Sequence, residues 1–269
     1  MVTMSQKPRH EGLHAMAEDA TQEVVASRRP WYAVGKVARI LFVLYALFLV
    51  LFGALAWWVH SSPVLPLDVT ITRTLQEDHA PWLRVVMLSI SFLGSALVLW
   101  PLILLVAAVL FWLLGLRLEA ITIVMLSAIS KGLNVVLKLL VARPRPTRHL
   151  VDVFQVATGQ SFPSEHVMVY LAFWGLLFCF GIILFRGKHW WRILWLVVCA
   201  TLVVLVGLSR IYLGDHWASD VMGSYLIGGV LLGVTLWVYL KLKERGILET
   251  KSMRERTVQS EVFRSFPRK

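Results

Sequence analysis

The stretch ILWLVVCATLVVLVGLSRIYLGDHWASDVMGSYLIGGVLLGVTLWVYL, residues 193–240, contains two long apolar segments separated by a short polar one. The apolar segments, 193–209 and 221–240, carry no charged residue, and each is long enough to cross a bilayer core, which takes roughly 17–25 residues. Ser209, Arg210, His216 and Asp220 lie in or beside the polar segment. The pattern predicts two membrane helices whose connection carries chemically active side chains, because polar groups at such positions are costly unless they are used.

Further apolar segments extend this pattern over residues 38–240. Uncharged stretches run over 40–59, 85–116 and 167–185, and the stretch 119–141 is interrupted only by two lysines. Because 85–116 is too long for one span, we expect a break at Gly94–Ser95, with a short interfacial helix before it and a span near 96–115. A surface helix is expected around LDVTITRTLQ, residues 67–76. The predicted fold class is all-α, a six-span transmembrane helical bundle with a short outer interfacial helix.

Composition excludes several other classes of protein. Of the 269 residues, 58% are hydrophobic and 16% charged, and the mean hydropathy is +0.70, which argues against a disordered chain or an ordinary soluble domain. The net charge of +11 could suggest a nucleic-acid partner, but the basic residues flank apolar spans and form no zinc pattern or basic recognition helix. Cys179 and Cys199 lie inside apolar runs and predict packing residues, not a disulfide framework.

The distribution of basic residues predicts the orientation. Residues 1–37 form a polar segment and 241–269 a basic tail, and placing both in the cytoplasm puts 19 of the 27 basic residues on that side. The chain is then a multi-pass cell-membrane protein. Alternation of the spans places the end of the third, the start of the fourth and the connection between the fifth and sixth together on the extracytoplasmic face.

Three polar blocks meet at that face and suggest phosphate chemistry. Lys138, Arg145 and Arg210 are cations with too few carboxylates to pair them, so an anion is expected among them, and Arg and Lys suit phosphate oxygens. Ser164 adds a hydroxyl at the start of a helix, where free N–H groups favour an anion. A metal site is the competing use of the histidines, but these cations would repel a divalent ion, so neither a metal nor another cofactor is expected.

Two histidines supply the reactive groups in this interpretation. His216 and Asp220 are four residues apart on one helical face, so Asp220 can fix the imidazole tautomer and leave the other nitrogen free to attack. His166 lies on another helix and is a candidate general acid for a leaving oxygen. The combination predicts phosphoryl transfer through a phosphohistidine.

The pattern Lys138-x6-Arg145-Pro146, Pro163-Ser164-x-His166 and Ser209-Arg210-x5-His216-x3-Asp220 resembles the three-part signature of the type-2 phosphatidic acid phosphatase superfamily. The resemblance covers residues 38–240 and implies a membrane phosphatase domain that removes phosphate from lipids without a metal. By position it implies His216 as nucleophile, Asp220 as its orienting residue and His166 as the acid. It implies that the phosphate is bound by Lys138, Arg145, Ser164 and Arg210, with Glu165 in the same block.

Glu165 departs from the family pattern, which has Gly there. Glu165 keeps the backbone N–H that the family offers to phosphate but adds a carboxylate, which would repel a phosphate dianion if it faced inward. We expect it to face outward in an active enzyme. A slowed, retuned or inactive site is the alternative.

Several neighbouring polar residues allow two interpretations each. Ser127, Lys131, Asn134 and Lys138 recur on one helical face and could form the floor of a headgroup pocket, or Lys131 could simply snorkel towards polar groups. Arg143, Arg148 and His149 could grip a second phosphate or an acidic headgroup, or merely face anionic lipid.

The predicted function is hydrolysis of a lipid phosphate at the outer leaflet. Phosphatidic acid, phosphatidylglycerol phosphate and a polyprenyl diphosphate are the substrates that the resemblance implies, and the oligomeric state is left open. Two alternatives remain: a phosphotransferase of the same fold with a lipid acceptor, and a non-catalytic lipid-binding or transport relative.

Overall fold

The computed structural model describes residues 35–95, 99–155, 157–185 and 189–248. The chain divides into two compact units, Leu47–Thr250 and the terminal segments Met1–Ala46 with Lys251–Lys269. Within the terminal unit, the described residues are 35–46, the helical start of α2 (Gly35–Ser61). All contacts reported below lie within the larger unit.

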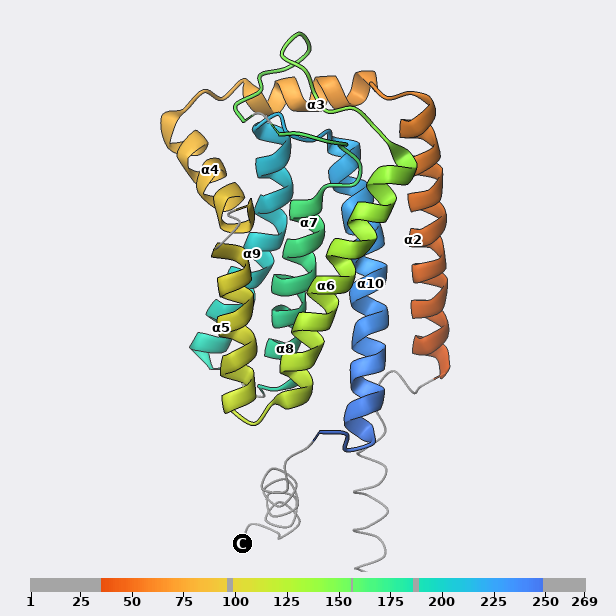
Figure 1. Ribbon diagram of the computed structural model, residues 1–269, viewed down its shortest axis with the longest axis vertical. Helices are drawn as coiled ribbons and strands as arrows, with labels where there is room; N and C mark the ends of the chain where they lie inside the picture. Colours follow the sequence, from red (N-terminus) through yellow and green to blue (C-terminus); the bar gives the residue numbers. More distant parts are fainter. Residues whose placement is uncertain (1–34, 96–98, 156, 186–188, 249–269) are drawn as a thin grey trace, which may run out of the picture. The chain divides into compact units, whose positions relative to one another are not determined.

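Every regular element among the described residues is helical (Figure 1). After α2 the chain forms α3 (Pro66–Gln76), α4 (Pro81–Ser95), α5 (Leu99–Leu113), α6 (Arg117–Val141), α7 (Glu165–Tyr170), the π-helical turn η2 (Leu171–Gly175), α8 (Leu176–Ile183), α9 (Trp190–Tyr212) and α10 (Ala218–Glu244). The all-α prediction is confirmed, and the surface helix expected around residues 67–76 is α3.

Five stretches are long and apolar enough to cross a membrane by themselves. They are Arg39–Ser61, Arg117–Val141, Glu165–Ile183, Trp190–Tyr212 and Ala218–Glu244. Helices α4 and α5 pass the same test only as a pair, with axes that differ by 63°, so the count is six if this bent pair forms one span. The 15 residues of α5 extend only about 22 Å, less than a bilayer core of about 30 Å, so α5 alone is shorter than the span expected near 96–115.

The span formed by α7, η2 and α8 is central to the fold. In its most apolar window 61% of the residues are buried, compared with 6–33% in the other four single spans. Figure 1 shows α7 and α8 among α6, α9 and α10, and Phe173, Leu176 and Phe180 pack there with Leu126 of α6 and Tyr239 of α10. The beginning of α7, which carries Ser164 and His166, is therefore held by neighbours on several sides.

The short helix α3 buries a polar face. Asp68, Thr72 and Gln76 recur every four residues and are all buried, so they lie on one side of the helix. Gln76 accepts a bond from the Asp152 backbone N–H (3.0 Å) and donates to the Asp152 and Tyr212 carbonyl oxygens (2.8 Å each). Through these bonds α3 ties the loop before α7 to the end of α9.

Candidate active site

The loop after α6 brings Arg143 and Arg145 to the site. Helix α6 ends at Val141, and Ala142 takes a left-handed backbone conformation (φ 50°) that turns the chain out of the helix. Pro144 and Pro146 lack a backbone N–H and cannot continue a helix, so the segment after α6 stays non-helical. Lys138, in the last turn of α6, remains on the helix below it.

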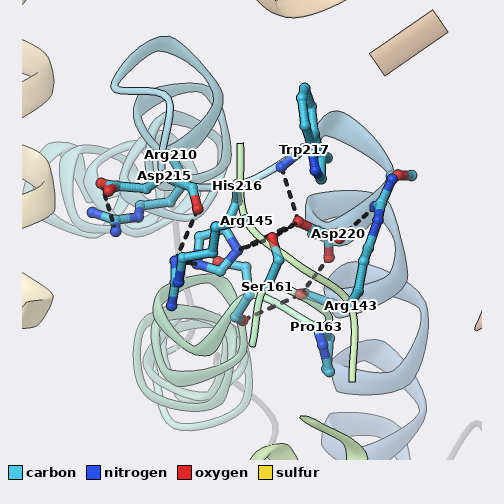
Figure 2. A network of polar contacts seen from close by, with 12 residues as sticks. Arg143, Arg145, Ser161, Pro163, Arg210, Asp215, His216, Trp217 and Asp220 are labelled. Carbon is cyan, nitrogen blue, oxygen red and sulfur yellow. Dashed lines mark hydrogen bonds and ion pairs between the residues drawn. The ribbon is translucent and has the colours of Figure 1, made fainter. Parts of the chain in front are cut away.

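Arg145 contacts the predicted nucleophile. One guanidinium nitrogen of Arg145, Nη1, lies 3.2 Å from His216 Nε2 and donates to the Asp215 carbonyl at 2.8 Å (Figure 2). Because arginine only donates, Nε2 is the acceptor, which places the ring proton on Nδ1. The lone pair of His216 Nε2 is therefore directed towards the Arg145 guanidinium.

The opposite edge of the His216 ring, which carries Nδ1, lies near Asp220. His216 Nδ1 is 3.5 Å from Asp220 Oδ2 and 3.5 Å from Ser161 Oγ, and Ser161 donates a short bond to Asp220. The Trp217 backbone N–H also donates to Asp220, at 2.9 Å, from the residue before α10 (Figure 2). The carboxylate is thereby fixed on the side of the ring that carries the proton.

Burial keeps His216 neutral. The side chain is almost completely inaccessible, and the pKa of His216 falls from the ordinary 6.5 to about 3, with desolvation as the largest cause. The charges of Arg145 and Arg210 contribute to this lowering, while the hydrogen bond and charge of Asp220 oppose it. A neutral imidazole whose Nε2 carries no proton is the form that can attack phosphorus.

Arg143 is part of the support of Asp220. Its guanidinium is buried and pairs with Asp220 Oδ1 through Nη1 (2.6 Å) and with Asp68 Oδ2 through Nη2 (2.7 Å). It also donates to Ser219 Oγ (2.7 Å) and to the Pro63 carbonyl (2.8 Å). The idea that Arg143 grips a second phosphate or a headgroup is wrong, because all three of its nitrogens are used inside the protein. Arg148 and His149 are exposed.

Arg210 has a carboxylate partner that the sequence analysis missed. Its Nη2 lies 2.7 Å from Asp215 Oδ2, and its Nη1 bonds to Ser91 of α4. Burial raises the pKa of Asp215, whereas the positive charges of Arg210 and Arg145 oppose that shift. The expectation that the cations have too few carboxylates to pair them is therefore wrong for Arg210. The sequence did contain a sign of this partner, because an acidic residue stands directly before His216.

Several buried polar atoms around this centre have no hydrogen-bond partner among the described residues. Three of them, Ser164 Oγ, His166 Nε2 and Arg210 Nε, belong to the predicted site residues, and Asp215 Oδ1 and Trp217 Nε1 lie on either side of His216. Ser164 precedes α7, yet its hydroxyl does not cap that helix. His166 has Arg210, His216, Lys138 and Arg145 as its electrostatic neighbours. Buried polar groups of this kind usually have partners, so their convergence is suited to a ligand with several oxygens.

Glu165 does not turn away from the cations. Its Oε2 lies 3.6 Å from Lys138 Nζ, and its Oε1 lies 3.8 Å from Lys131 Nζ. The outward orientation expected for Glu165 is wrong, as is the expectation that Lys138 lacks a carboxylate. Lys131 extends towards a polar group, as the second interpretation of this residue expected, and that group is the Glu165 carboxylate.

The polar face of α6 does not form a common pocket floor. Asn134 is buried and donates to the Pro163 carbonyl at 3.1 Å, and Ser127 is buried as well. The neighbouring Ser130 donates to the Met168 carbonyl at 3.2 Å. Asn134 and Ser130 thus bind the backbone around α7, whereas Ser127 Oγ has no hydrogen-bond partner among the described residues and the Lys131 side chain is 67% exposed.

Asp68 and Ser161 are further supporting residues that sequence reasoning did not find. Neither belongs to the three blocks, and each reaches the site over a long sequence separation. For Asp68 a signal existed in the repeat of polar residues along α3, which resembles an exposed helical face but is buried. No cluster of three or more His, Cys, Asp and Glu side chains in the described part of the chain is arranged to hold a metal ion.

Comparisons with known proteins agree with this geometry. The family profile described as PAP2 superfamily matches residues 117–244, which include all three polar blocks. Phosphatidylglycerophosphatase B of Bacillus subtilis is 30% identical over 196 residues, covering 70% of this chain and 89% of that protein.

Two solved structures are similar to the fold. The transmembrane PAP2 type phosphatidylglycerolphosphate phosphatase from Bacillus subtilis matches with a TM-score of 0.61 at 27% identity, covering 74% of this chain and 96% of its own. LpxE of Aquifex aeolicus matches in fold with a TM-score of 0.51 at 22% identity, covering 65% and 98%. The likeness extends over nearly the whole length of these relatives, and this chain belongs to the PAP2 superfamily.

Proposed function

We propose that this protein hydrolyses the phosphate monoester of a membrane lipid, of the phosphatidylglycerophosphate class, through a phosphohistidine at His216. Membership of the PAP2 superfamily makes the chain a phosphoric ester hydrolase of the membrane. The proposed lipid class rests on the names of the relative and of the solved structure, both of which act on phosphatidylglycerol phosphate.

The contact between Arg145 and His216 Nε2 carries the proposal. At 3.2 Å it places a permanent cation beside the only ring nitrogen that can attack, while Asp220 lies on the opposite side of the ring. A phosphate oxygen can replace Nε2 as the acceptor for Arg145, which brings phosphorus next to the lone pair. A structural role alone would not require the neutral ring to face a cation.

In the first step Nε2 of His216 forms a bond to phosphorus as the bond from phosphorus to the lipid oxygen breaks. The cations Arg145, Arg210 and Lys138 neutralise charge on the three remaining oxygens, and the Ser164 hydroxyl donates a hydrogen bond to one of them. His166 enters this step as the imidazolium, donates its proton to the departing lipid oxygen and becomes neutral. In the second step His166 accepts a proton from water, whose oxygen attacks phosphorus and releases inorganic phosphate and neutral His216. The proton count closes over one turnover.

The proposed orientation places both termini in the cytoplasm and the active site on the extracytoplasmic face. The distribution of the 27 basic residues supports it, and the polar blocks lie at the same end of their helices as α3. The lipid tail would then remain among the helices while the headgroup reaches the cations.

The test is phosphate release from a panel of lipid monophosphates and diphosphates, with and without EDTA. We expect the greatest kcat/KM with phosphatidylglycerol phosphate, no loss with EDTA, and a loss of at least about 10³-fold in His216→Ala. His149→Ala, which removes an exposed loop histidine, is the matched control and should retain wild-type turnover.

Four results would overturn the proposal. Loss of activity with EDTA would indicate a metal-dependent reaction, and full activity in His216→Ala would exclude the nucleophile. A phosphorylated lipid acceptor formed without matching free phosphate would identify a transferase, while a protein that releases phosphate from no lipid would be a binding relative.

A further inference from the structure

The Glu165 carboxylate lies between two lysines at the edge of the cation cluster. Its two oxygens face different lysines of α6, Lys138 at 3.6 Å and Lys131 at 3.8 Å. The lysines are seven residues apart, which separates their backbone positions by about 10 Å along the helix. A single carboxylate thus bridges an inner and an outer cation.

The two ends of this bridge differ in environment. The Lys138 side chain is 14% exposed, that of Glu165 37% and that of Lys131 67%. Lys138 belongs to the phosphate-binding block, whereas Lys131 lies outside it. A small rotation of the Glu165 side chain away from Lys138 therefore keeps its charge paired with Lys131.

We propose that Glu165 is a specificity-determining residue of the phosphate site, whose carboxylate competes with substrate phosphate for Lys138 and is retained by Lys131 when phosphate binds. The proposal rests on the proposed function, because it takes Lys138 as a phosphate ligand. Lys131 is then a positioning residue that acts only through Glu165, and its ion pair explains an ionised lysine within a membrane span.

A fixed carboxylate beside the site selects substrates by charge. Coulomb repulsion grows with the charge of the ligand, so Glu165 disfavours a lipid diphosphate more than a lipid monophosphate. Removal of the carboxylate should improve binding of both and improve that of the diphosphate more. The family's Gly at this position would lack this discrimination.

The experiment compares Glu165→Gln, Lys131→Met and the double variant with wild type in detergent micelles. The readouts are KM and kcat for a lipid monophosphate and a lipid diphosphate, and the Kd of inorganic phosphate measured by calorimetry. The Kd does not depend on turnover. Lys241→Met is the matched control, because Lys241 is also a partly exposed lysine whose ion pair, with Glu244, has the same 3.8 Å separation.

We expect Glu165→Gln to lower the phosphate Kd and the monophosphate KM by about fivefold, with a larger fall for the diphosphate and a smaller change in kcat. Lys131→Met should raise the Kd and KM about threefold, because Glu165 then pairs with Lys138 alone. The double variant should match Glu165→Gln, and Lys241→Met should match wild type. If Glu165→Gln does not fold, Glu165→Gly replaces it.

Two results would overturn this inference. A phosphate Kd that rises in Glu165→Gln would mean that the carboxylate assists binding, and an effect of Lys131→Met that persists in the double variant would mean that Lys131 acts independently of Glu165. Failure of the proposed function has a different signature: no variant would release phosphate from lipids, while the Kd values would still decide the role of Glu165.

Discussion

The chemistry of the single residue His216 depends on its being neutral while surrounded by cations. Its desolvated ring has a pKa of about 3, below the 6.5 of an exposed histidine. Between these two values the unfolded chain binds a proton that the folded protein does not. Acidification through this interval therefore destabilises the fold through His216, and leaves the folded nucleophile deprotonated.

We predict that the ring of His216 shows no protonation between pH 7.5 and about 4.5 in the substrate-free protein. Nitrogen chemical shifts of histidine-labelled protein provide the measurement, with the His216 signal assigned by its loss in His216→Gln. Free histidine added to the same sample serves as the internal control for the titration range of an ordinary imidazole. A His216 signal that titrates near pH 6.5 would contradict the account.

Arg143 stabilises the site by neutralising two buried carboxylates, those of Asp68 and Asp220. Its guanidinium and the Asp68 and Asp220 carboxylates are almost completely buried, so removal of the cation leaves two carboxylates without it. We predict that Arg143→Met lowers the free energy of unfolding by about 3 kcal/mol or more and abolishes turnover. Arg143→Lys should recover little, because one ammonium cannot reproduce the forked contacts.

Thermal unfolding in detergent measures this prediction, with Arg148→Met as the control. Arg148 lies in the same loop but is exposed, so its removal should change stability by less than about 0.5 kcal/mol. Equal losses in the two variants would show that the ion pairs with Asp68 and Asp220 do not hold the site.

At the scale of elements, the five-residue connection between α9 and α10 sets the position of the nucleophile. Gly214 has φ +69°, and a Cβ at this position would overlap the carbonyl oxygen of Asp152. The connection also turns back on α9, since the N–H groups of Asp215 and His216 both donate to the Arg210 carbonyl (3.1 and 3.2 Å). Only glycine fits this turn without moving Asp215 and His216.

We predict that Gly214→Ala destabilises the protein by roughly 2 kcal/mol and lowers kcat more than tenfold, because the loop must shift to relieve the overlap. Gly159→Ala is the control, since Gly159 has φ +77° but open space around it. Gly159→Ala should lower the free energy of unfolding by only about 1 kcal/mol, the cost of placing a side chain at a positive φ. Similar kcat values for the two variants would contradict the role given to Gly214.

The elements also show how far the sequence could predict the structure. The positions of the membrane helices could be predicted from the lengths of the uncharged stretches. That the three polar blocks lie on one side of the membrane could be predicted because successive spans cross it in alternate directions. The break between α4 and α5 was expected at Gly94–Ser95, but the sequence did not reveal that α5 alone is too short to cross. The buried polar face of α3 could not be predicted, because polar periodicity normally indicates exposure and the partner of Asp68 is 75 residues away.

The orientation of single side chains was the least predictable feature. Arg143 and Arg145 are two residues apart in one proline-rich segment, yet one supports Asp220 and the other contacts His216. Glu165 turns to the lysines because the beginning of α7 lies beside α6. Such contacts depend on how helices pack, which residue spacing does not specify.

At the scale of the whole molecule, the account requires the polar blocks to face the extracytoplasmic side. We predict that an impermeant maleimide added to intact cells labels Thr147→Cys but not Lys241→Cys, in a background with Cys179 and Cys199 replaced by serine. Thr147 is exposed in the loop after α6, and Lys241 lies at the other end of α10. Permeabilised cells are the control, where both should react, and the reverse pattern in intact cells would contradict the orientation.

The central claim is that phosphate passes through a covalent bond to His216, and trapping that bond tests it most directly. Wild-type protein mixed with a ³²P-labelled lipid monophosphate and denatured in alkali within milliseconds should carry a label that survives base and is released by acid, and peptide mass spectrometry should place it on His216. His166→Ala, supplied with a substrate whose leaving group needs no proton, should accumulate more of this label, because the water step is slowed. Turnover with no acid-labile label in either protein, or a label on another residue, would contradict the account.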